Sequence, residues 1–303
     1  MFLEYAKDGQ LWTSTGTLDA ETSDGIIKFT GHMWIEDTTD GGASDFIPSV
    51  DGSALKRWLV APEQSPEITL GWKDSSHQPR TSDEDAPLKV HCHCNTVQLL
   101  ITRPNERSLD ASSPFPDLTH PSKSAHSPNP NNEAWWISKD KKRYLAGTCA
   151  CESCRLHTGF DIMSWSFVPM SNVTFTDGAA IKGTNDGLDS DPRINQMMGM
   201  VKSPTEEGTK RHFCRKCGAT VFWWGSARPT LLDVAVGLID APTGVRCEEW
   251  LEWHGDRVSF AEEAFNKALI KGLAEGLREW KHGKVAEERK GTAAEADSQV
   301  HPS

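Results

Sequence analysis

Short hydrophobic stretches, separated by turn residues, run through the middle of the chain. They are rich in β-branched and aromatic side chains, are bounded by Gly, Pro, Asn or Asp, and include residues 97–102, 163–168, 219–224 and 231–239. Runs of this length and composition are typical of β-strands. The glycine patterns of Rossmann and P-loop nucleotide sites do not occur. The pattern therefore predicts a mainly β domain.

A helical pattern follows these strands. Its hydrophobic positions recur at intervals of four, four, four and three, at Phe265, Leu269, Leu273, Leu277 and Trp280. This spacing places them on one helix face, which we expect to pack on the core. Ser259 and Glu262 have the spacing of a capping box and predict where the helix begins.

Two glycines interrupt the predicted helix. Gly272 and Gly276 each weaken an isolated helix by about 1 kcal/mol relative to alanine, so tertiary contacts must stabilise it. After residue 284 the chain is polar and charged, without periodicity. We expect residues 285–303 to be a disordered tail.

The amino-terminal part differs from the rest. Residues 1–86 contain no cysteine, but include a predicted strand at 28–36 and a helical-looking segment at 54–59. A polar linker then predicts a boundary near residue 86 and a second domain over 87–284. Within that domain, the polar stretch 104–132 is either a lid or a plain insertion, and the sequence does not decide between them.

Charge and the amino-terminal residues narrow the function classes. The 303-residue chain has a formal net charge of −11, which opposes binding to nucleic-acid phosphates. The first ten residues do not resemble a signal peptide, so we expect a cytoplasmic protein, not bound to a membrane, with reduced cysteines.

Seven of the eight cysteines fall into three tight groups. The groups are Cys92 and Cys94; Cys149, Cys151 and Cys154; and Cys214 and Cys217. Cysteines with one or two residues between them can direct their sulfurs at one cation. Tetrahedral zinc takes four protein ligands in structural sites and three in catalytic ones. Seven divides as four plus three. We therefore expect two Zn²⁺ ions.

The two pairs, taken together, would form the structural site, and the triplet would form the catalytic site with one open position. Disulfides conflict with the expected compartment, and the spacing does not match ferredoxin iron–sulfur runs. A nucleic-acid-binding zinc ribbon remains an alternative, although Cys154 and Cys214 are 60 positions apart, far more than in such ribbons. The remaining cysteine, Cys247, is interpreted as a buried apolar residue.

Three blocks carry a family resemblance: CHC at 92–94, AGTCACESCRLHTGF at 146–160 and RHFCRKCGATVFWW at 211–224. Their order and spacing resemble the glutathione-dependent formaldehyde-activating enzyme family, which includes centromere protein V. The resemblance covers about residues 88–262 and is closest to the larger fungal members. It implies an Mss4-like fold of coiled antiparallel sheets pinned by zinc. It also implies that residues 1–86 are a degenerate partial copy of the same domain, although an extra sheet packed on the domain explains them equally well.

The resemblance implies the chemistry of an S-(hydroxymethyl)glutathione synthase, a carbon–sulfur lyase that adds the thiol of glutathione to formaldehyde. The small-molecule partners would then be glutathione and an aldehyde. Cys149, Cys151 and Cys154 would hold the catalytic zinc. Nearby, Arg155 could pair with a substrate carboxylate, and His157 could relay a proton or supply a fourth zinc ligand.

Two alternatives to this function stay open. The first is a zinc-stabilised binding protein without catalysis, and the second is an enzyme acting on a different substrate, such as a secondary metabolite. His91 and His93 flank the first cysteine pair and are interpreted as bystanders, since four cysteines already complete that site. Trp165 and Trp223 are expected to pack the sheets.

Overall fold

A computed structural model describes most of the chain. The described residues are 3–5, 11–19, 23, 25–76, 86–114, 118–119, 129–203 and 207–300. The predicted 104–132 insertion lies partly outside them, so its interpretation as a lid or an insertion stays open.

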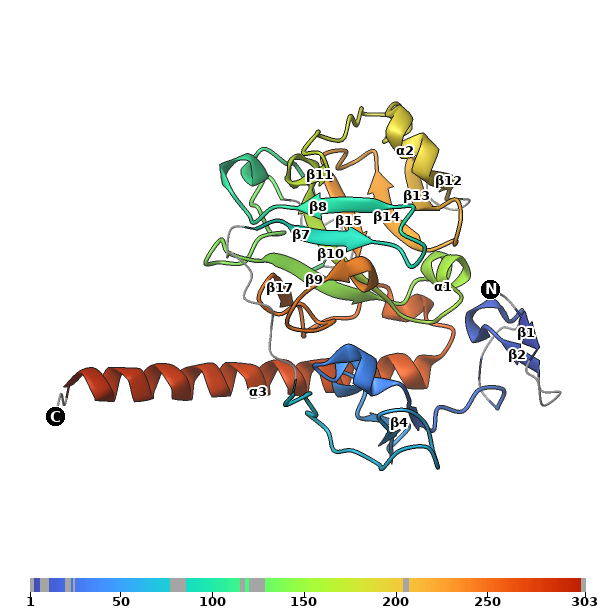
Figure 1. The fold of residues 1–303 in the computed structure, drawn as a ribbon, viewed down its shortest axis with the longest axis vertical. Coiled ribbons are helices and arrows are strands. Elements are labelled where there is room, and N and C mark those ends of the chain that lie inside the picture. Colours follow the sequence, from blue (N-terminus) through green and yellow to red (C-terminus); the bar gives the residue numbers. More distant parts are fainter. Residues whose placement is uncertain are drawn as a thin grey trace.

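Two β-sheets form the centre of the molecule (Figure 1). The larger sheet has seven strands, in the order β12 (Met198–Lys202), β13 (Thr209–Cys214), β14 (Thr220–Gly225), β15 (Leu231–Ala235), β10 (Met163–Pro169), β9 (Tyr144–Cys149) and β17 (Leu251–Trp253). The smaller sheet has the order β11 (Val173–Phe175), β8 (Gln98–Ile101), β7 (Leu88–His91) and β16 (Ile239–Asp240). Neighbouring strands are antiparallel except for β9 and β17.

The four hydrophobic stretches found in the sequence form β8, β10, β14 and β15, with β16 at the end of the last stretch. Leu99 on β8 and Phe222 on β14 are almost fully buried in one shared core. The predicted mainly β fold, compatible with an Mss4-like domain, is confirmed.

Three α-helices complete the described fold: α1 (Glu152–Thr158), α2 (Pro192–Met197) and α3 (Lys267–Val300). The predicted apolar stripe of α3 is confirmed, since Leu269, Leu273 and Leu277 are each at most 1% exposed. In Figure 1, α3 lies beside the sheets, and N-terminal residues lie against its first half.

The start of α3 differs from the prediction. The cap is Asn266, whose Oδ1 accepts a hydrogen bond from the Leu269 N–H at 2.8 Å. Ser259 is instead engaged with β9, because its N–H donates to the Thr148 carbonyl and its own carbonyl accepts from the Ala150 N–H. The capping-box assignment at Ser259 was therefore wrong.

The last helix, α3, is described as far as Val300. The expected disordered tail over 285–303 stays a prediction. Residues 285–300 include four Ala and three Glu, which favour helix formation.

The amino-terminal region forms small two-stranded pieces. These are β1 (Leu3–Tyr5) with β2 (Leu11–Thr13), β3 (Gly31–His32) with β6 (Lys56–Arg57), and β4 (Ser49–Val50) with β5 (Ser53–Ala54). The predicted 28–36 strand is reduced to β3, and the helical-looking segment 54–59 is extended. The domain boundary at 86 and the partial-copy hypothesis stay predictions.

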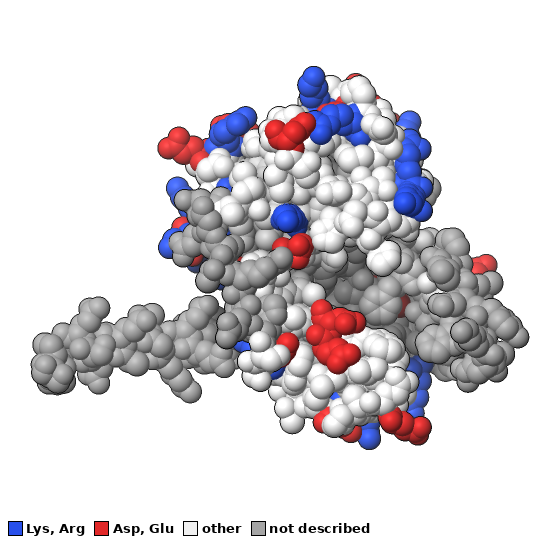
Figure 2. Space-filling model, in the orientation of Figure 1, with Lys and Arg blue, Asp and Glu red and all other residues white. Residues whose placement is uncertain are grey.

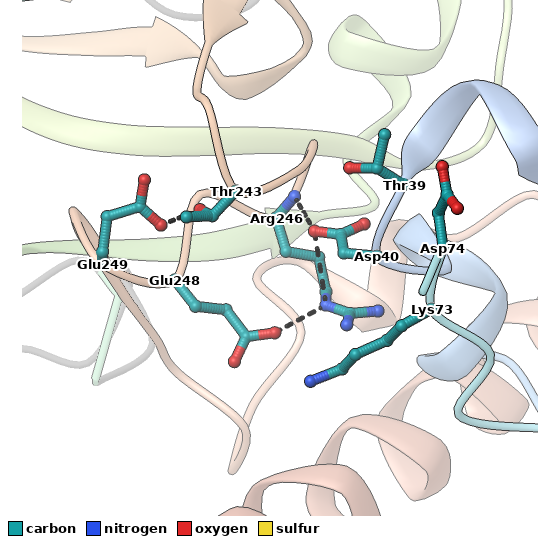
Figure 3. Close-up of a pocket in the computed structure, with 8 residues that line it drawn as sticks. All are labelled: Thr39, Asp40, Lys73, Asp74, Thr243, Arg246, Glu248 and Glu249. Carbon is teal, nitrogen blue, oxygen red and sulfur yellow. Dashed lines mark hydrogen bonds and ion pairs between the residues drawn. The ribbon is translucent and has the colours of Figure 1, made fainter. Parts of the chain in front are cut away.

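Arg246 joins this region to the sheets (Figure 3). Its side chain is 2% exposed, and its Nη1 donates to Asp45 at 2.9 Å while its Nε donates to Glu248 at 2.8 Å. Its backbone N–H donates to Asp40 at 2.8 Å. The surrounding pocket has a volume of ≈ 240 Å³ and is lined by Thr39, Asp40, Lys73, Asp74, Thr243, Arg246, Glu248 and Glu249. A buried, multiply bonded arginine thus fixes the two regions together.

The distribution of charged side chains on the surface is consistent with the net negative charge of the sequence. On the face in Figure 2, Lys and Arg are interrupted by acidic and uncharged residues and do not merge into one basic surface. Within the described ranges, every helix is too short or too polar to cross a lipid bilayer.

Candidate metal centres

Two groups of cysteines converge in space. The sulfurs of Cys92, Cys94, Cys214 and Cys217 lie within 4.8 Å of one another, and those of Cys149, Cys151 and Cys154 form a second group by the same measure. The division into four plus three predicted from the sequence is the division seen in the structure. Each group could hold a metal ion.

The four-cysteine group has the dimensions of a zinc site. The Sγ of Cys94 lies 3.5 Å from that of Cys92 and 3.6 Å from that of Cys214. Tetrahedral zinc with bonds near 2.3 Å separates its sulfurs by about 3.8 Å. The residues present therefore fit zinc without rearrangement.

Two tight loops build this group. The Cys92–Cys94 loop follows β7, and the Cys214–Cys217 loop joins β13 to β14. Backbone N–H groups of Val97 and Lys216 donate to Cys92 Sγ at 3.3 Å and to Cys214 Sγ at 3.4 Å. Such donors favour the thiolate form that binds metal.

The pKa of Cys94 is lowered to about 6, above all by its hydrogen bond with the Thr96 side chain.

After the second pair, Gly218 has a φ of 75°, a left-handed conformation that glycine adopts without steric cost. The chain therefore turns directly after the last thiolate.

The triplet is placed by the junction of β9 and α1. Cys149 is the last residue of β9, Cys151 is the N-cap of α1, and Cys154 lies in its first turn. The Cys154 N–H donates to Cys151 Sγ at 3.3 Å. A short strand-to-helix turn therefore directs three sulfurs at one point.

All three triplet cysteines are buried, with exposures of 6%, 7% and 3% in chain order. Hydrogen bonds from the neighbouring thiols of Cys149 and Cys154 lower the pKa of Cys151 to about 2. The same sharing raises the pKa of Cys149 well above its ordinary value. Among the described residues, the group gains no fourth His, Cys, Asp or Glu ligand. Three thiolates fit zinc with one protein-free position.

Arg211 on β13 approaches the triplet and was missed in the sequence. It is 4% exposed, and its Nη2 donates to Ser153 Oγ at 2.6 Å and lies 3.7 Å from Cys154 Sγ. Burial lowers its pKa, but the nearby sulfurs of Cys154, Cys151 and Cys149 outweigh this and leave it raised. The guanidinium is therefore a fixed positive charge beside the triplet.

Arg155, predicted to pair with a substrate carboxylate, points elsewhere. Its Nη1 donates to the Gly16 carbonyl at 2.6 Å, and its guanidinium lies 4.5 Å from the Phe265 ring. Its Nη2 lies 3.7 Å from Glu152. These contacts tie α1 to residues 15–17 of the amino-terminal region.

His157 lies near the C-terminal end of α1, and Arg211 is one of its charged neighbours. Burial, and secondarily the charge of Arg211, lower its pKa below the ordinary value. Its ring centroid is 5.9 Å from that of Phe213. His157 does not join the triplet sulfurs as a ligand.

Four buried polar atoms on residues of β9, α1 and β13 lack a hydrogen-bond partner within the described part of the chain. They are Thr148 Oγ1, Arg155 Nε, His157 Nε2 and Arg211 Nε. Buried polar groups in folded proteins are normally paired, with protein, water or ligand. Arg211 Nε belongs to the guanidinium beside Cys154, so a polar ligand or ordered water at this place would satisfy it.

Three other residues considered in the sequence, two tryptophans and the eighth cysteine, pack in the core. Trp165 is buried against the triplet, and Trp223 packs partly buried beside it. Cys247 is 1% exposed in the main core, as expected. His91 and His93 stay outside both cysteine groups.

Comparison with known families supports this geometry. Residues 137–253 match the family model described as glutathione-dependent formaldehyde-activating enzyme. The formaldehyde-activating match contains the triplet and the second pair, whereas Cys92 and Cys94 come from outside it. The fold therefore completes the four-cysteine group from beyond the matched segment.

Other comparisons add little to the formaldehyde-activating assignment. No curated protein matches the chain. A solved structure of a Rhodobacter sphaeroides protein, a structural-genomics target, is 16% identical over 55% of this chain and 99% of its own. Its TM-score of 0.28 supports no conclusion about fold or function.

Proposed function

We propose that the protein is a zinc-dependent carbon–sulfur lyase-like enzyme that resembles S-(hydroxymethyl)glutathione synthase. In this proposal, it activates a small thiol or carbonyl compound beside Cys149, Cys151 and Cys154. The four-cysteine site would be structural. The cellular location remains our expectation of a cytoplasmic protein.

The difference in ligand number between the two sites carries the proposal. Four cysteines converge at one site and three at the other. A structural zinc site is closed by four protein ligands, whereas a catalytic site keeps a position for substrate. The unpaired Nε of Arg211, whose guanidinium lies beside Cys154, supports the same assignment.

Zinc bound there would act as a Lewis acid that stabilises a thiolate or a developing oxyanion. In the proposed addition, the thiol sulfur forms a bond to the carbonyl carbon. The π electrons of C=O move to oxygen, and the thiol proton ends on that oxygen. The protein would contribute proximity and charge stabilisation, without a covalent intermediate.

Two side chains would assist this proton and charge movement. Arg211 would stabilise negative charge near Cys154, from which its Nη2 is 3.7 Å. His157, held neutral by burial and with a free Nε2, would accept the thiol proton and return it to the alkoxide. Arg155 would position α1, because its Nη1 is already bound to the Gly16 carbonyl.

Exchange NMR with ¹³C-formaldehyde and glutathione tests the proposal. The spontaneous adduct forms without enzyme, so the measured quantity is the exchange rate with and without zinc-loaded protein. We expect acceleration by the native chain and none by Cys151→Ser. Cys247→Ala is the matched control, because this buried cysteine lies outside both groups. Zinc-loaded native protein that leaves the rate unchanged would contradict the formaldehyde reaction.

Burial of the triplet favours a second candidate, a zinc-stabilised binding protein without catalysis. All three cysteines are buried, with exposures of 7% or less, which restricts access of a substrate to them. Calorimetry separates the two functions. Glutathione binding that disappears when the triplet metal is removed favours the enzyme, whereas tightly held zinc with no thiol binding favours the binding protein. Thiol binding without formaldehyde exchange would point to an enzyme with a different substrate.

A further inference from the structure

The two cysteine groups differ in how solvent can balance their charge. The four-cysteine group includes the exposed Cys217 and the half-buried Cys94, so water reaches it. Every cysteine of the triplet is buried. Three thiolates with one divalent cation leave one net negative charge, and burial of an unbalanced charge is costly. The triplet therefore needs a positive charge from the protein.

Arg211 is placed to supply it. The side chain comes from β13, where residue 211 pairs with Trp223 of β14, and Trp223 packs on the triplet. Ser153 Oγ accepts a hydrogen bond from Nη2 at 2.6 Å, which holds the guanidinium against α1. The same Nη2 is 3.7 Å from Cys154 Sγ. Strand pairing and one serine thus fix the cation on the sulfur side of α1.

The other nearby arginine does not compete for this role. Arg155 is bound to the Gly16 carbonyl and lies close to Glu152, whose carboxylate offsets its charge. Arg211 instead keeps its Nη2 on the triplet, 2.6 Å from Ser153 Oγ and 3.7 Å from Cys154 Sγ.

We propose that Arg211 is a positioning residue that sets the metal affinity of the triplet, with Ser153 holding its guanidinium in place. The inference rests on the proposed zinc at the triplet but not on the reaction performed there. Groups that contact metal ligands from outside typically change metal affinity by about 10- to 100-fold when removed. Arg211 balances the site with a permanent charge, because guanidinium stays protonated at working pH.

Zinc competition with a chromophoric chelator, on the full chain at one neutral pH, tests this. We expect native protein to release two zincs with two affinities. Arg211→Gln should weaken one site about 10- to 100-fold and leave the other unchanged. Ser153→Ala, which keeps the charge but frees the guanidinium, should weaken the same site by a smaller factor.

Arg215→Gln is the matched control. Arg215 is exposed, lies next to Cys214 of the other group, and its Nε donates to the Asn195 carbonyl at 2.8 Å. It should leave the triplet affinity unchanged. If Arg211→Gln folds and binds both zincs as the native chain does, the inference is overturned. Equal weakening of both sites would also overturn it, by showing a general structural role.

Arg211→Lys covers the case in which Arg211→Gln does not fold. Lysine keeps the charge but lacks the planar fork, so we expect an intermediate loss of affinity at the triplet alone. Unchanged affinity in this variant would then count against the inference. A native chain that holds only one zinc would contradict the proposed function itself, before any variant is made.

Discussion

Gly276 of α3 lies directly against Phe46 of the amino-terminal region. A Cβ at position 276 would sit 2.3 Å from the Phe46 carbonyl oxygen. One turn earlier, a Cβ at Gly272 would meet the Ser49 carbonyl at the same distance. The two glycines that weaken the isolated helix therefore let another part of the chain pack directly on it.

We predict that Gly276→Ala destabilises the fold. The added methyl group meets backbone that has little freedom to move, and overpacking of this kind costs about 1–3 kcal/mol. Urea unfolding followed by tryptophan fluorescence measures the change. Gly283→Ala is the control, since this α3 residue has open space around it. The control should gain up to about 1 kcal/mol from helix propensity. Equal stability of the two variants would refute the close contact.

The buried ion pairs of Arg246 give a second prediction. Arg246→Gln would leave Asp45, 6% exposed at its side chain, and Asp40 without their charge partner. Removal of one partner from a buried pair costs about 3–5 kcal/mol. Lys56→Gln breaks the exposed pair with Glu67 and should cost less than about 1 kcal/mol. Chemical denaturation compares the two, and similar small losses would contradict a structural role for Arg246.

Stability should fall as the pH is lowered from 7 to 5, in part because of His32. Burial is the main cause that lowers the pKa of this histidine, whose Nε2 lies 2.9 Å from the Ile47 carbonyl oxygen. The unfolded chain takes up a proton below about pH 6.5, whereas the folded chain takes it up only at a lower pH. His32 therefore favours folding above that pH and loses this contribution below it, by at most about 1.4 kcal/mol per pH unit.

His32→Gln isolates this contribution, because glutamine can donate to the same carbonyl without titrating. Thermal or urea unfolding at several pH values should show a shallower pH dependence in the variant. Acid loss of metal affects both proteins and cancels in the comparison. Parallel pH profiles for variant and native chain would rule out His32 as a contributor.

The contact between residue 16 and α1 gives a fourth prediction. The Gly16 N–H donates to the Gly159 carbonyl at 3.0 Å, and a Cβ at residue 16 would lie 2.4 Å from the Gly159 carbonyl carbon. Gly16→Ala should therefore detach residues 14–18 from α1 while the sheets stay folded. Hydrogen exchange should show faster exchange at residue 16 and unchanged protection in β9 and β10. Native-like protection at residue 16 would contradict this contact.

Local sequence patterns predicted much of this molecule. The cysteine spacing predicted the members of each loop, because these are neighbours in the chain, and the apolar stripe of α3 follows from helical periodicity. The four-cysteine group also needs two loops 120 positions apart to meet, which was inferred from the number of cysteines that zinc takes. The sequence did not predict that Arg211 lies beside Cys154. The two residues are 57 positions apart, and strand pairing brings them together. The helix cap predicted at Ser259 was wrong for a similar reason, because the backbone of Ser259 hydrogen-bonds with residues at the end of β9. Tertiary pairing overrode a local capping signal at this position.

Metal content of three proteins tests the division of the cysteines most directly. Elemental analysis would be made on the native chain, Cys151→Ser and Cys214→Ser, with circular dichroism as a check of folding. Since metal binding at a structural site contributes folding free energy, we predict two zincs in the native chain and unfolded or insoluble Cys214→Ser protein. Cys151→Ser should be folded and hold one zinc. If the two variants unfold alike, or Cys151→Ser keeps both zincs, the assignment of one structural and one catalytic site is contradicted.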